Sequence, residues 1–371
     1  MKFVWFVAKL SIIGIVFIIF FEFFSFLGTK LELFLVNDTP RFYKTSLNSK
    51  YTPKYDSKKL YTTKPWGDWK IPNRSIRHQT ECFDYTLSTN EVGARDTSFE
   101  RLNKQKIFLL GDSFAEGWGV KDSETSQFYL EKILKKEVLN FGSAGDLGPL
   151  QYLMIYEHFK QKYKHQEILV YFLPSNDFSD NDAIIWEKYG RNIGRDRPYF
   201  SNKENVLTPF YFKKNKAQKI NNKKKIISVN KIKAWIVYHT YSSNILRSIS
   251  YLAQGYSGVG GYYNSYEYQN RNVISAFNKL VEIAEQKLVT FVVIPTIGDI
   301  KEKNKSKDIY KTQLWFKGLK KLELKKNVTL INLMESLPDN YKTLFHDCDG
   351  HWSAHGNKWA AKTIADIIKN R

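Results

Sequence analysis

The sequence predicts an α/β fold in which helices cover both faces of a five-stranded parallel sheet, in three layers. Short apolar runs rich in β-branched and aromatic residues recur along the chain, as is typical of buried strands. Longer segments of helical period separate these runs. Strands and helices that alternate in this order form doubly wound parallel sheets. With 371 residues, the chain is long enough for one such domain with additions.

Five predicted strands alternate with helices, and a last helix closes the chain. The strands span residues 106–110, 137–141, 168–173, 288–294 and 328–333. The helices span residues 125–136, 150–163, 273–286, 309–322 and 356–369. In the helix at 273–286, the residues Val273, Phe277, Leu280, Val281 and Ala284 fall on one helical face, which predicts that this face is buried.

An apolar stretch near the N-terminus, residues 10–29, is about as long as the hydrocarbon core of a bilayer is thick. It lacks an Ala-x-Ala-like cleavage site, so we expect residues 1–30 to be an uncleaved signal anchor with one transmembrane helix. Glu22 alone interrupts the stretch, at a cost on the order of a few kcal/mol in lipid. The neighbouring Phe and Ile residues offset that cost, or Glu22 marks a contact with a partner helix. Residues 31–64 are polar, show no sustained period and predict a stalk.

A long insertion, residues 179–270, separates the third and fourth predicted strands and far exceeds a usual crossover. It contains a basic stretch at 213–233, an amphipathic segment at 232–252 and a Gly/Tyr-rich loop at 255–268. Insertions at the carboxyl end of a parallel sheet lie over the site, so we predict a cap that determines specificity. The glycines of the loop follow no strand, and they predict a turn or hinge instead of a nucleotide site.

The candidate nucleophile is Ser113, in the stretch IFLLGDSFAEGWGV that runs from Ile107 to Val120. An apolar strand ends just before Ser113, which puts its hydroxyl at the carboxyl end of the sheet, where open α/β folds gather their chemistry. A serine hydroxyl is a weak nucleophile and needs a base, a group that orients the base, and donors for the oxyanion. The alternative role for Ser113 is that of a helix N-cap.

Three later blocks carry residues of these types. NFGSAG at 140–145 and SND at 175–177 each follow a predicted strand, and DGHWSAHG at 349–356 precedes the last helix. These blocks, in this order, resemble the SGNH (GDSL-type) hydrolase family. The flanking TNEVGARD at 89–96 and FSDND at 178–182 resemble its membrane-anchored bacterial members. The resemblance covers residues 65–371 apart from the insertion, and it implies a flavodoxin-like SGNH hydrolase domain.

The resemblance implies a role for each matching residue. Ser113 is similar to the family nucleophile and His351 to its general base. The N–H groups of Ser113 and Gly145 and the side-chain amide of Asn176 match the donors of the oxyanion hole.

The acid that orients His351 departs from the usual pattern. The family often places an aspartate three residues before the histidine, and here that position is Cys348. The anchored members commonly read Asp-x-His, which selects Asp349. His355, four residues after His351, is the alternative base.

The same loop also carries residue types that bind zinc: His346, Asp347, Cys348, Asp349, His351 and His355. Their spacing fits no standard zinc site, so we expect no metal, and we expect no cofactor. The chain has two cysteines, Cys82 and Cys348. If the domain is exported, a disulfide between them is chemically permitted, and two free thiols are the alternative.

The formal net charge of +20, from 57 basic and 37 acidic residues, favours anionic partners such as lipid headgroups or acidic polysaccharide. Because lysine is abundant throughout the chain, a merely solvated basic surface is the alternative. No nucleic-acid recognition motif accompanies the charge, so nucleic acid is not an expected partner.

The resemblance implies a serine esterase that removes an O-acetyl or short acyl group from an envelope glycan or lipid. It also implies a single-pass membrane protein whose catalytic domain lies outside the cytoplasm, in the periplasm or outside the cell. Two alternatives stay open: an O-acyltransferase that modifies an extracellular polysaccharide, and a catalytically silent glycan-binding protein. Other envelope proteins are further candidate partners.

Overall fold

The computed structural model describes most of the chain as two compact units. The described residues are 2–31, 33–34, 61–79, 82–99, 105–145, 147–185, 197–201, 206–211, 240–253, 266–300, 310–311, 313–346 and 349–371. One unit consists of Met1–Tyr51 and Asn215–Val259, and the other of Thr52–Lys214 and Gly260–Arg371. The chain therefore passes between the units three times. The predicted basic stretch at 213–233 lies outside the described residues, as does most of the predicted stalk and of the Gly/Tyr-rich loop.

The larger unit is built on a five-stranded parallel sheet with the strand order β6-β5-β7-β8-β9. The strands are β5 (Lys106–Leu110), β6 (Glu137–Asn140), β7 (Glu167–Phe172), β8 (Leu288–Val293) and β9 (Val328–Asn332). In sequence order this is 2-1-3-4-5, the order of flavodoxin-like folds. The predicted fold class is confirmed, and each strand lies within one or two residues of its predicted bounds.

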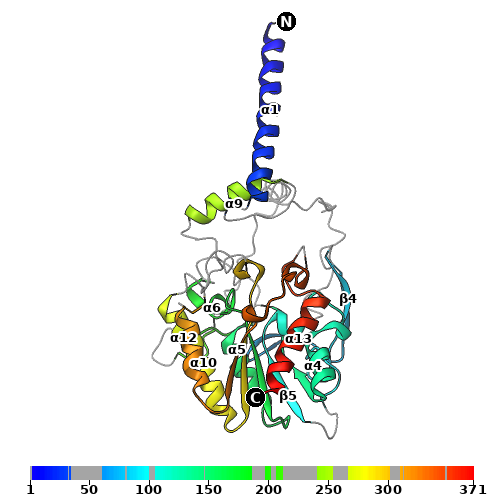
Figure 1. Cartoon of the computed structure of the whole chain (residues 1–371), viewed down its shortest axis with the longest axis vertical. Coiled ribbons are helices and arrows are strands. Elements are labelled where there is room, and N and C mark those ends of the chain that lie inside the picture. Colours follow the sequence, from blue (N-terminus) through cyan, green and yellow to red (C-terminus); the bar gives the residue numbers. More distant parts are fainter. Residues whose placement is uncertain are drawn as a thin grey trace. The chain divides into compact units, whose positions relative to one another are not determined.

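Helices cover both faces of this sheet (Figure 1). On one face, α4 (Ser126–Leu134) packs against α13 (Ala354–Lys369). On the other face, α10 (Glu267–Ala284) packs against α5 (Pro149–Phe159) and α12 (Leu314–Glu323). The three predicted layers are therefore present.

The helix α10 begins six residues before its predicted start at 273. Its first turns bury the polar residues Gln269, Asn270 and Asn272, which hide the apolar period from a sequence reading. Their polar groups find partners, as when Gln269 Nε2 donates a 2.5 Å hydrogen bond to Asp182 Oδ2. Buried polar residues are tolerated where they are paired.

Two antiparallel hairpins precede the sheet, and the sequence did not predict them. They pair β1 (Tyr61–Lys64) with β2 (Gly67–Lys70), and β3 (Ser75–Gln79) with β4 (Asp84–Ser88). Trp66 and Trp69 in the first hairpin are each 1% exposed and meet edge to face. Both tryptophans are therefore core residues.

The remaining elements of the larger unit are short. They are α3 (Ser113–Glu116), α6 (Asp177–Asp180) and the 3-10 turns Asp122–Glu124, Leu333–Ser336 and Tyr341–Leu344.

The smaller unit contains two described helices, α1 (Lys2–Lys30) and α9 (Ser242–Ala253). Within α1, the segment Trp5–Lys30 is long and apolar enough to cross a membrane. Because it lies near the N-terminus, a signal sequence fits the same observation. The helix α9 coincides with the C-terminal half of the predicted amphipathic segment at 232–252.

Candidate active site

Ser113 is the first residue of α3, just beyond the carboxyl end of β5. The Oδ1 atom of Asp112 accepts a 2.9 Å hydrogen bond from the N–H of Phe114, so Asp112, and not Ser113, is the N-cap of α3. The N-cap alternative for Ser113 is therefore wrong. The hydroxyl of Ser113 does not cap the helix and can form a hydrogen bond with another side chain.

The structure brings Ser113, His351 and Asp349 into one hydrogen-bonded chain of side chains. His351 Nε2 is 2.8 Å from Ser113 Oγ, and its Nδ1 is bonded to Asp349 Oδ1. The main-chain N–H of His351 also donates to Asp349 Oδ1, at 3.2 Å. One tautomer fits both ring contacts, with Nδ1 donating to Asp349 and Nε2 accepting from Ser113. In that tautomer, His351 is oriented to take the serine proton.

Asp349 has a second donor on its other oxygen. The indole Nε1 of Trp118 donates a 3.2 Å hydrogen bond to Asp349 Oδ2. Partial burial tends to raise the pKa of Asp349, but the hydrogen bonds and charge of His351 and the indole of Trp118 outweigh it and hold the pKa below its usual value. The carboxylate is therefore ionised and able to stabilise an imidazolium.

Two aromatic rings flank the imidazole of His351. The ring of Phe114 lies 5.0 Å from it and that of Trp118 lies 6.1 Å from it, centroid to centroid. Phe114 itself is 5% exposed and packs edge to face on Trp352. These contacts restrict the ring of His351 to the orientation that meets Ser113.

Asn176 follows β7, where its side-chain Nδ2 donates a 3.3 Å hydrogen bond to Asp112 Oδ2. Asp112 is 2% exposed, and burial raises its pKa against the opposing effects of the Phe114 N–H, His351 and Asn176. An amide nitrogen carries two hydrogens, so Asn176 keeps one for a further acceptor. Asp112 thus fixes the amide beside Ser113.

Gly145 lies in the loop that follows β6, at the same edge of the sheet. Its φ of 124° lies in the region that favours glycine. Three residues earlier, a Cβ on Gly142 would stand 2.5 Å from the N–H nitrogen of Glu116, so only glycine lets this loop pack on α3. Gly145 does not itself join the hydrogen-bonded chain that contains Ser113.

A buried ion pair is hydrogen-bonded to the loop that contains Gly145. Lys70 Nζ lies 2.6 Å from Glu116 Oε2, and both side chains are at most 3% exposed. Lys70 also donates to Ser143 Oγ at 3.0 Å, while Glu116 Oε2 accepts the N–H of Ala144. The pair therefore fixes the two residues that precede Gly145.

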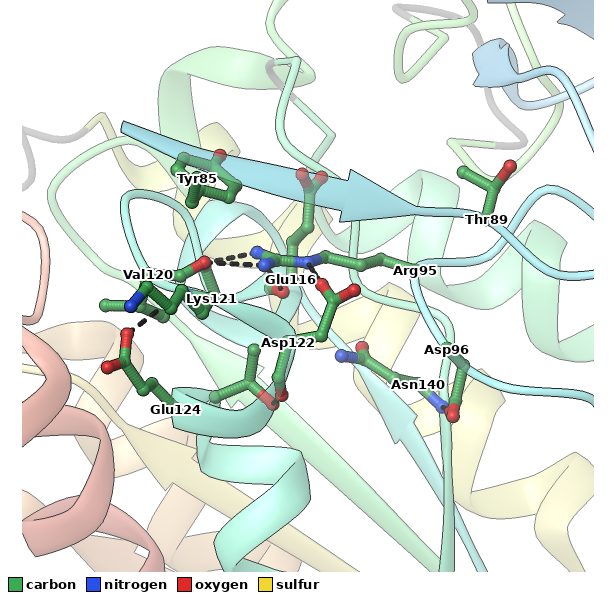
Figure 2. Close-up of polar contacts among 12 residues, drawn as sticks. Tyr85, Thr89, Arg95, Asp96, Glu116, Val120, Lys121, Asp122, Glu124 and Asn140 are labelled. Carbon is green, nitrogen blue, oxygen red and sulfur yellow. Dashed lines mark hydrogen bonds and ion pairs between the residues drawn. The ribbon is translucent and has the colours of Figure 1, made fainter. Parts of the chain in front are cut away.

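Arg95 contacts the main chain of the loop that follows α3 (Figure 2). Its guanidinium donates to the main-chain oxygens of Gly117, at 2.5 Å, and Val120, at 2.6 Å, and pairs with Asp122 at 2.8 Å. Arg95 is 2% exposed and stacks over the ring of Tyr85. It thereby fixes both ends of the turn that carries Trp118.

The next residue, Asp96, bonds to the neighbouring strand. Its Oδ2 accepts a 3.0 Å hydrogen bond from the N–H of Asn140, at the end of β6 (Figure 2). The TNEVGARD segment therefore supports two loops at once: the turn after Ser113, through Arg95, and the start of the Gly145 loop, through Asp96.

The carboxyl group of Asp177 lies fully buried next to Asn176. Burial and the nearby charges of Asp112 and Asp180 raise its pKa well above the usual value, although the N–H of Leu173 and the hydroxyl of Tyr152 oppose this by donating to it, each at 2.9 Å. These bonds fix the turn that presents Asn176.

The alternative base, His355, is not directed at Ser113, since its Nδ1 lies 3.2 Å from Thr343 Oγ1. Among the described residues, no three His, Cys, Asp or Glu side chains are grouped to hold a metal ion. Asp347 and Cys348 lie outside the described residues. Cys82 takes part in a disulfide, and because Cys348 is not described, their pairing stays a prediction.

Sequence reasoning did not single out Trp118, Lys70, Glu116 or Arg95. Trp118 and Glu116 stand within five residues of Ser113, and a tryptophan and an acid directly after a candidate nucleophile were a usable signal. Lys70 carried none, because its partners Glu116 and Ser143 lie 46 and 73 residues away.

No family model matches the sequence, and no curated protein does. Solved structures similar to it include a member of the lipolytic G-D-S-L family from Veillonella parvula DSM 2008 (12% identity, 72% of this chain and 100% of that chain, TM-score 0.38). A further neighbour is TesA, with 12% identity over 72% of this chain and 99% of that chain and a TM-score of 0.39. Another is a carbohydrate esterase family 2 enzyme from Corynascus thermopiles, with 10% identity over 77% of this chain and 70% of that chain and a TM-score of 0.39. The structure from Veillonella parvula belongs to the lipolytic G-D-S-L family, which is the family that the sequence motifs resemble. Because the TM-scores lie below 0.5, we draw neither the fold nor the activity of this chain from these likenesses.

Proposed function

We propose that this chain is a serine esterase of the SGNH hydrolase type. One observation carries the proposal: His351 Nε2 lies 2.8 Å from Ser113 Oγ while its Nδ1 is bonded to Asp349. This is the nucleophile, base and orienting acid that hydrolysis of an ester requires. The four sequence blocks in the order of the family support the same assignment.

The proposed reaction proceeds through an acyl-enzyme. His351 takes the Ser113 proton as the serine oxygen attacks the ester carbonyl, and Asp349 stabilises the imidazolium that forms. His351 then gives the proton to the departing alcohol oxygen as the C–O bond breaks. Water, deprotonated by His351, attacks the acyl-enzyme and regenerates Ser113.

The oxyanion of each tetrahedral intermediate needs donors that point at it before reaction. We assign these to the N–H groups of Ser113 and Gly145 and to the free hydrogen of the Asn176 amide. Their supports are in place, since Asp112 fixes Asn176, and Lys70 with Glu116 fixes the loop before Gly145.

The substrate class follows from the family resemblance and from α1. We propose an O-acetyl or short acyl ester on a glycan or lipid of the cell envelope. The helix α1 would act as a single-pass anchor, with the catalytic unit outside the cytoplasm. The apolar segment Trp5–Lys30 supports the anchor.

The test is release of chromophore from an aryl acetate by the full chain in detergent. Turnover should fall to background in Ser113→Ala, and the exposed Ser75→Ala should keep it. Turnover that survives in Ser113→Ala would exclude Ser113 as the nucleophile. Added oligosaccharide acceptors then separate two outcomes: an esterase gives free acetate, whereas an O-acyltransferase gives acetylated sugar in preference to acetate.

A further inference from the structure

The membrane-anchor candidate α1 is joined to a second helix of the same unit. Both carboxylate oxygens of Glu22, in the apolar part of α1, accept main-chain N–H groups at the start of α9. The donors are Tyr241 and Ser242, the latter at 3.0 Å. Of the two interpretations that the sequence left for Glu22, a contact with a partner helix therefore holds, and the partner belongs to the same chain.

A second polar contact lies further along α1. Asn244 Nδ2 donates a 2.9 Å hydrogen bond to Thr29 Oγ1, and both residues are buried. Seven residues separate Glu22 from Thr29, which is two helical turns, so both contacts lie on one face of α1. The ring of Tyr241 also meets that of Phe26 edge to face, 5.1 Å away.

The face of α9 that turns away from α1 is apolar and exposed. Ser243, Asn244 and Ser248 are buried, whereas Leu246 and Ile249 are 57% and 56% exposed. Figure 1 shows that α9 meets the C-terminal part of α1 at one end and extends away to the side instead of running along it. A helix of this kind, extending to the side of a membrane span and apolar on one face, has the geometry of an interfacial helix.

The positions of Glu22 and Thr29 along α1 agree with an interfacial location of α9. Glu22 precedes Lys30 by eight residues, which is about 12 Å along the helix. If the charged Lys30 lies at the membrane surface, then Glu22 lies inside the hydrocarbon region and Thr29 at its boundary. The α9 segment between these contacts therefore lies at the boundary between acyl chains and headgroups.

We propose that α9 is a second membrane-contacting element, an interfacial helix that Glu22 fixes to the anchor and that presents Leu246 and Ile249 to the acyl chains of the same bilayer. The inference rests on the proposed membrane anchor and not on the esterase activity. Lipid is the occupant that fits, because Leu246 and Ile249 are exposed on a helix that is hydrogen-bonded to the apolar segment Trp5–Lys30. The sequence just before α9, residues 213–233, adds nine lysines and no acidic residue, a composition that anionic headgroups attract.

The first test places an environment-sensitive fluorophore on α9 in the full chain, reconstituted into phosphatidylethanolamine and phosphatidylglycerol vesicles. The labelled variants are Leu246→Cys and Ile249→Cys, with the exposed Lys362→Cys on α13 as control and the unsubstituted chain as background. We expect lipids with a nitroxide near the headgroup to quench both α9 probes several-fold more than the control. Aqueous iodide should quench the control several-fold more than the α9 probes.

Each other outcome overturns the inference. Quenching of the α9 probes by iodide to the level of the control would place α9 in water. Protection from both quenchers would mean that protein covers this face. If alkaline carbonate extracted the full chain from membranes, the proposed membrane anchor and this inference would both be wrong. The aryl acetate assay tests the esterase proposal separately.

A second test concerns Glu22. A disulfide should form in membranes between Thr29→Cys and Asn244→Cys, and not between Gly14→Cys and Asn244→Cys, because Gly14 lies about 22 Å away along α1. Glu22→Leu should lower the yield of the first disulfide several-fold, and Glu22→Gln, which keeps one acceptor oxygen, should restore most of it. Equal yields for the two pairs, or no effect of Glu22→Leu, would contradict docking through Glu22.

Discussion

The indole Nε1 of Trp118 donates a 3.2 Å hydrogen bond to Oδ2 of Asp349, across 231 residues of sequence. Because His351 occupies the other oxygen, the carboxylate is held from both sides. The loop directly after the nucleophile therefore also orients the acid of the proposed triad.

Trp118→Phe should lower kcat/KM about tenfold or more, since a hydrogen bond to a charged group is worth about 1.5–3 kcal/mol. It should also raise the pKa of Asp349 toward its usual value, because one of the effects that lower this pKa is lost. A pH profile of kcat/KM measures both effects. Trp359→Phe is the matched control, because it removes an indole hydrogen bond of 3.2 Å, to Ser336, outside the site. Equal activity of the two variants would exclude a role for Trp118.

Asn176→Ala should reduce kcat by about 10²–10³-fold with little change in KM, because an oxyanion donor acts in the transition state more than in the ground state. Asn176→Asp should be at least as slow, since it sets a second carboxylate beside Asp112. Steady-state kinetics on an aryl acetate give the two constants, and circular dichroism confirms the fold. A variant that keeps the parental kcat would remove Asn176 from the mechanism.

Arg95→Lys should reduce the unfolding free energy by about 1–3 kcal/mol, because Arg95 reaches Asp122, Gly117 and Val120 with three different nitrogens, and the single nitrogen of lysine would leave a buried carbonyl unpaired. It should also reduce kcat, since the turn that carries Trp118 loosens. Denaturant unfolding and kinetics measure the two effects. Arg77→Lys is the control, because Arg77 pairs with Asp84 at the surface. If both variants behave alike, Arg95 does not fix the turn.

Asp177→Asn should change how stability depends on pH. The pKa of Asp177 in the folded chain is raised by burial and by the charges of Asp112 and Asp180, so folding favours its protonated form. Its contribution is fully present below the unfolded pKa and is lost as pH rises through the folded pKa. The variant should therefore gain stability over the parent as pH rises, and match it most closely at acid pH. Unfolding midpoints at several pH values test this, with the exposed Asp339→Asn as control. Parallel curves for parent and Asp177→Asn would contradict it.

The central sheet could be predicted because its strands are buried on both faces. Every residue of β7, which reads EILVYF, is buried, and so is each of β6. Such runs are nearly continuous in apolar residues and are bounded by turn signals. Since catalytic groups gather at the carboxyl ends of parallel strands, Ser113 and Asn176 could also be predicted from their positions just after β5 and β7.

The supports of the site could not be predicted, because they depend on contacts distant in sequence. Arg95 is buried against carbonyl groups, and carbonyl partners leave no mark in a sequence. Glu22 stayed open between two interpretations, because its partners on α9 lie about 220 residues further along the chain. The hairpins were missed because their strands are only four or five residues long, and β1 and β3 together bury a single residue, although β4 alternates between exposed and buried residues.

The three passages of the chain between the two units determine what a single proteolytic cut would separate. A protein on a single stalk is shed by one cut. Here, one cut between residues 35 and 60 would leave the catalytic unit covalently attached to residues 215–259 of the other unit, at both ends of that segment. The same cut would separate the catalytic unit covalently from α1, so the larger fragment would stay with α1 only through the contacts of Glu22 and Thr29 with Ser242 and Asn244. The hydrogen bonds between α1 and α9 would then decide whether a nicked molecule remains in one piece.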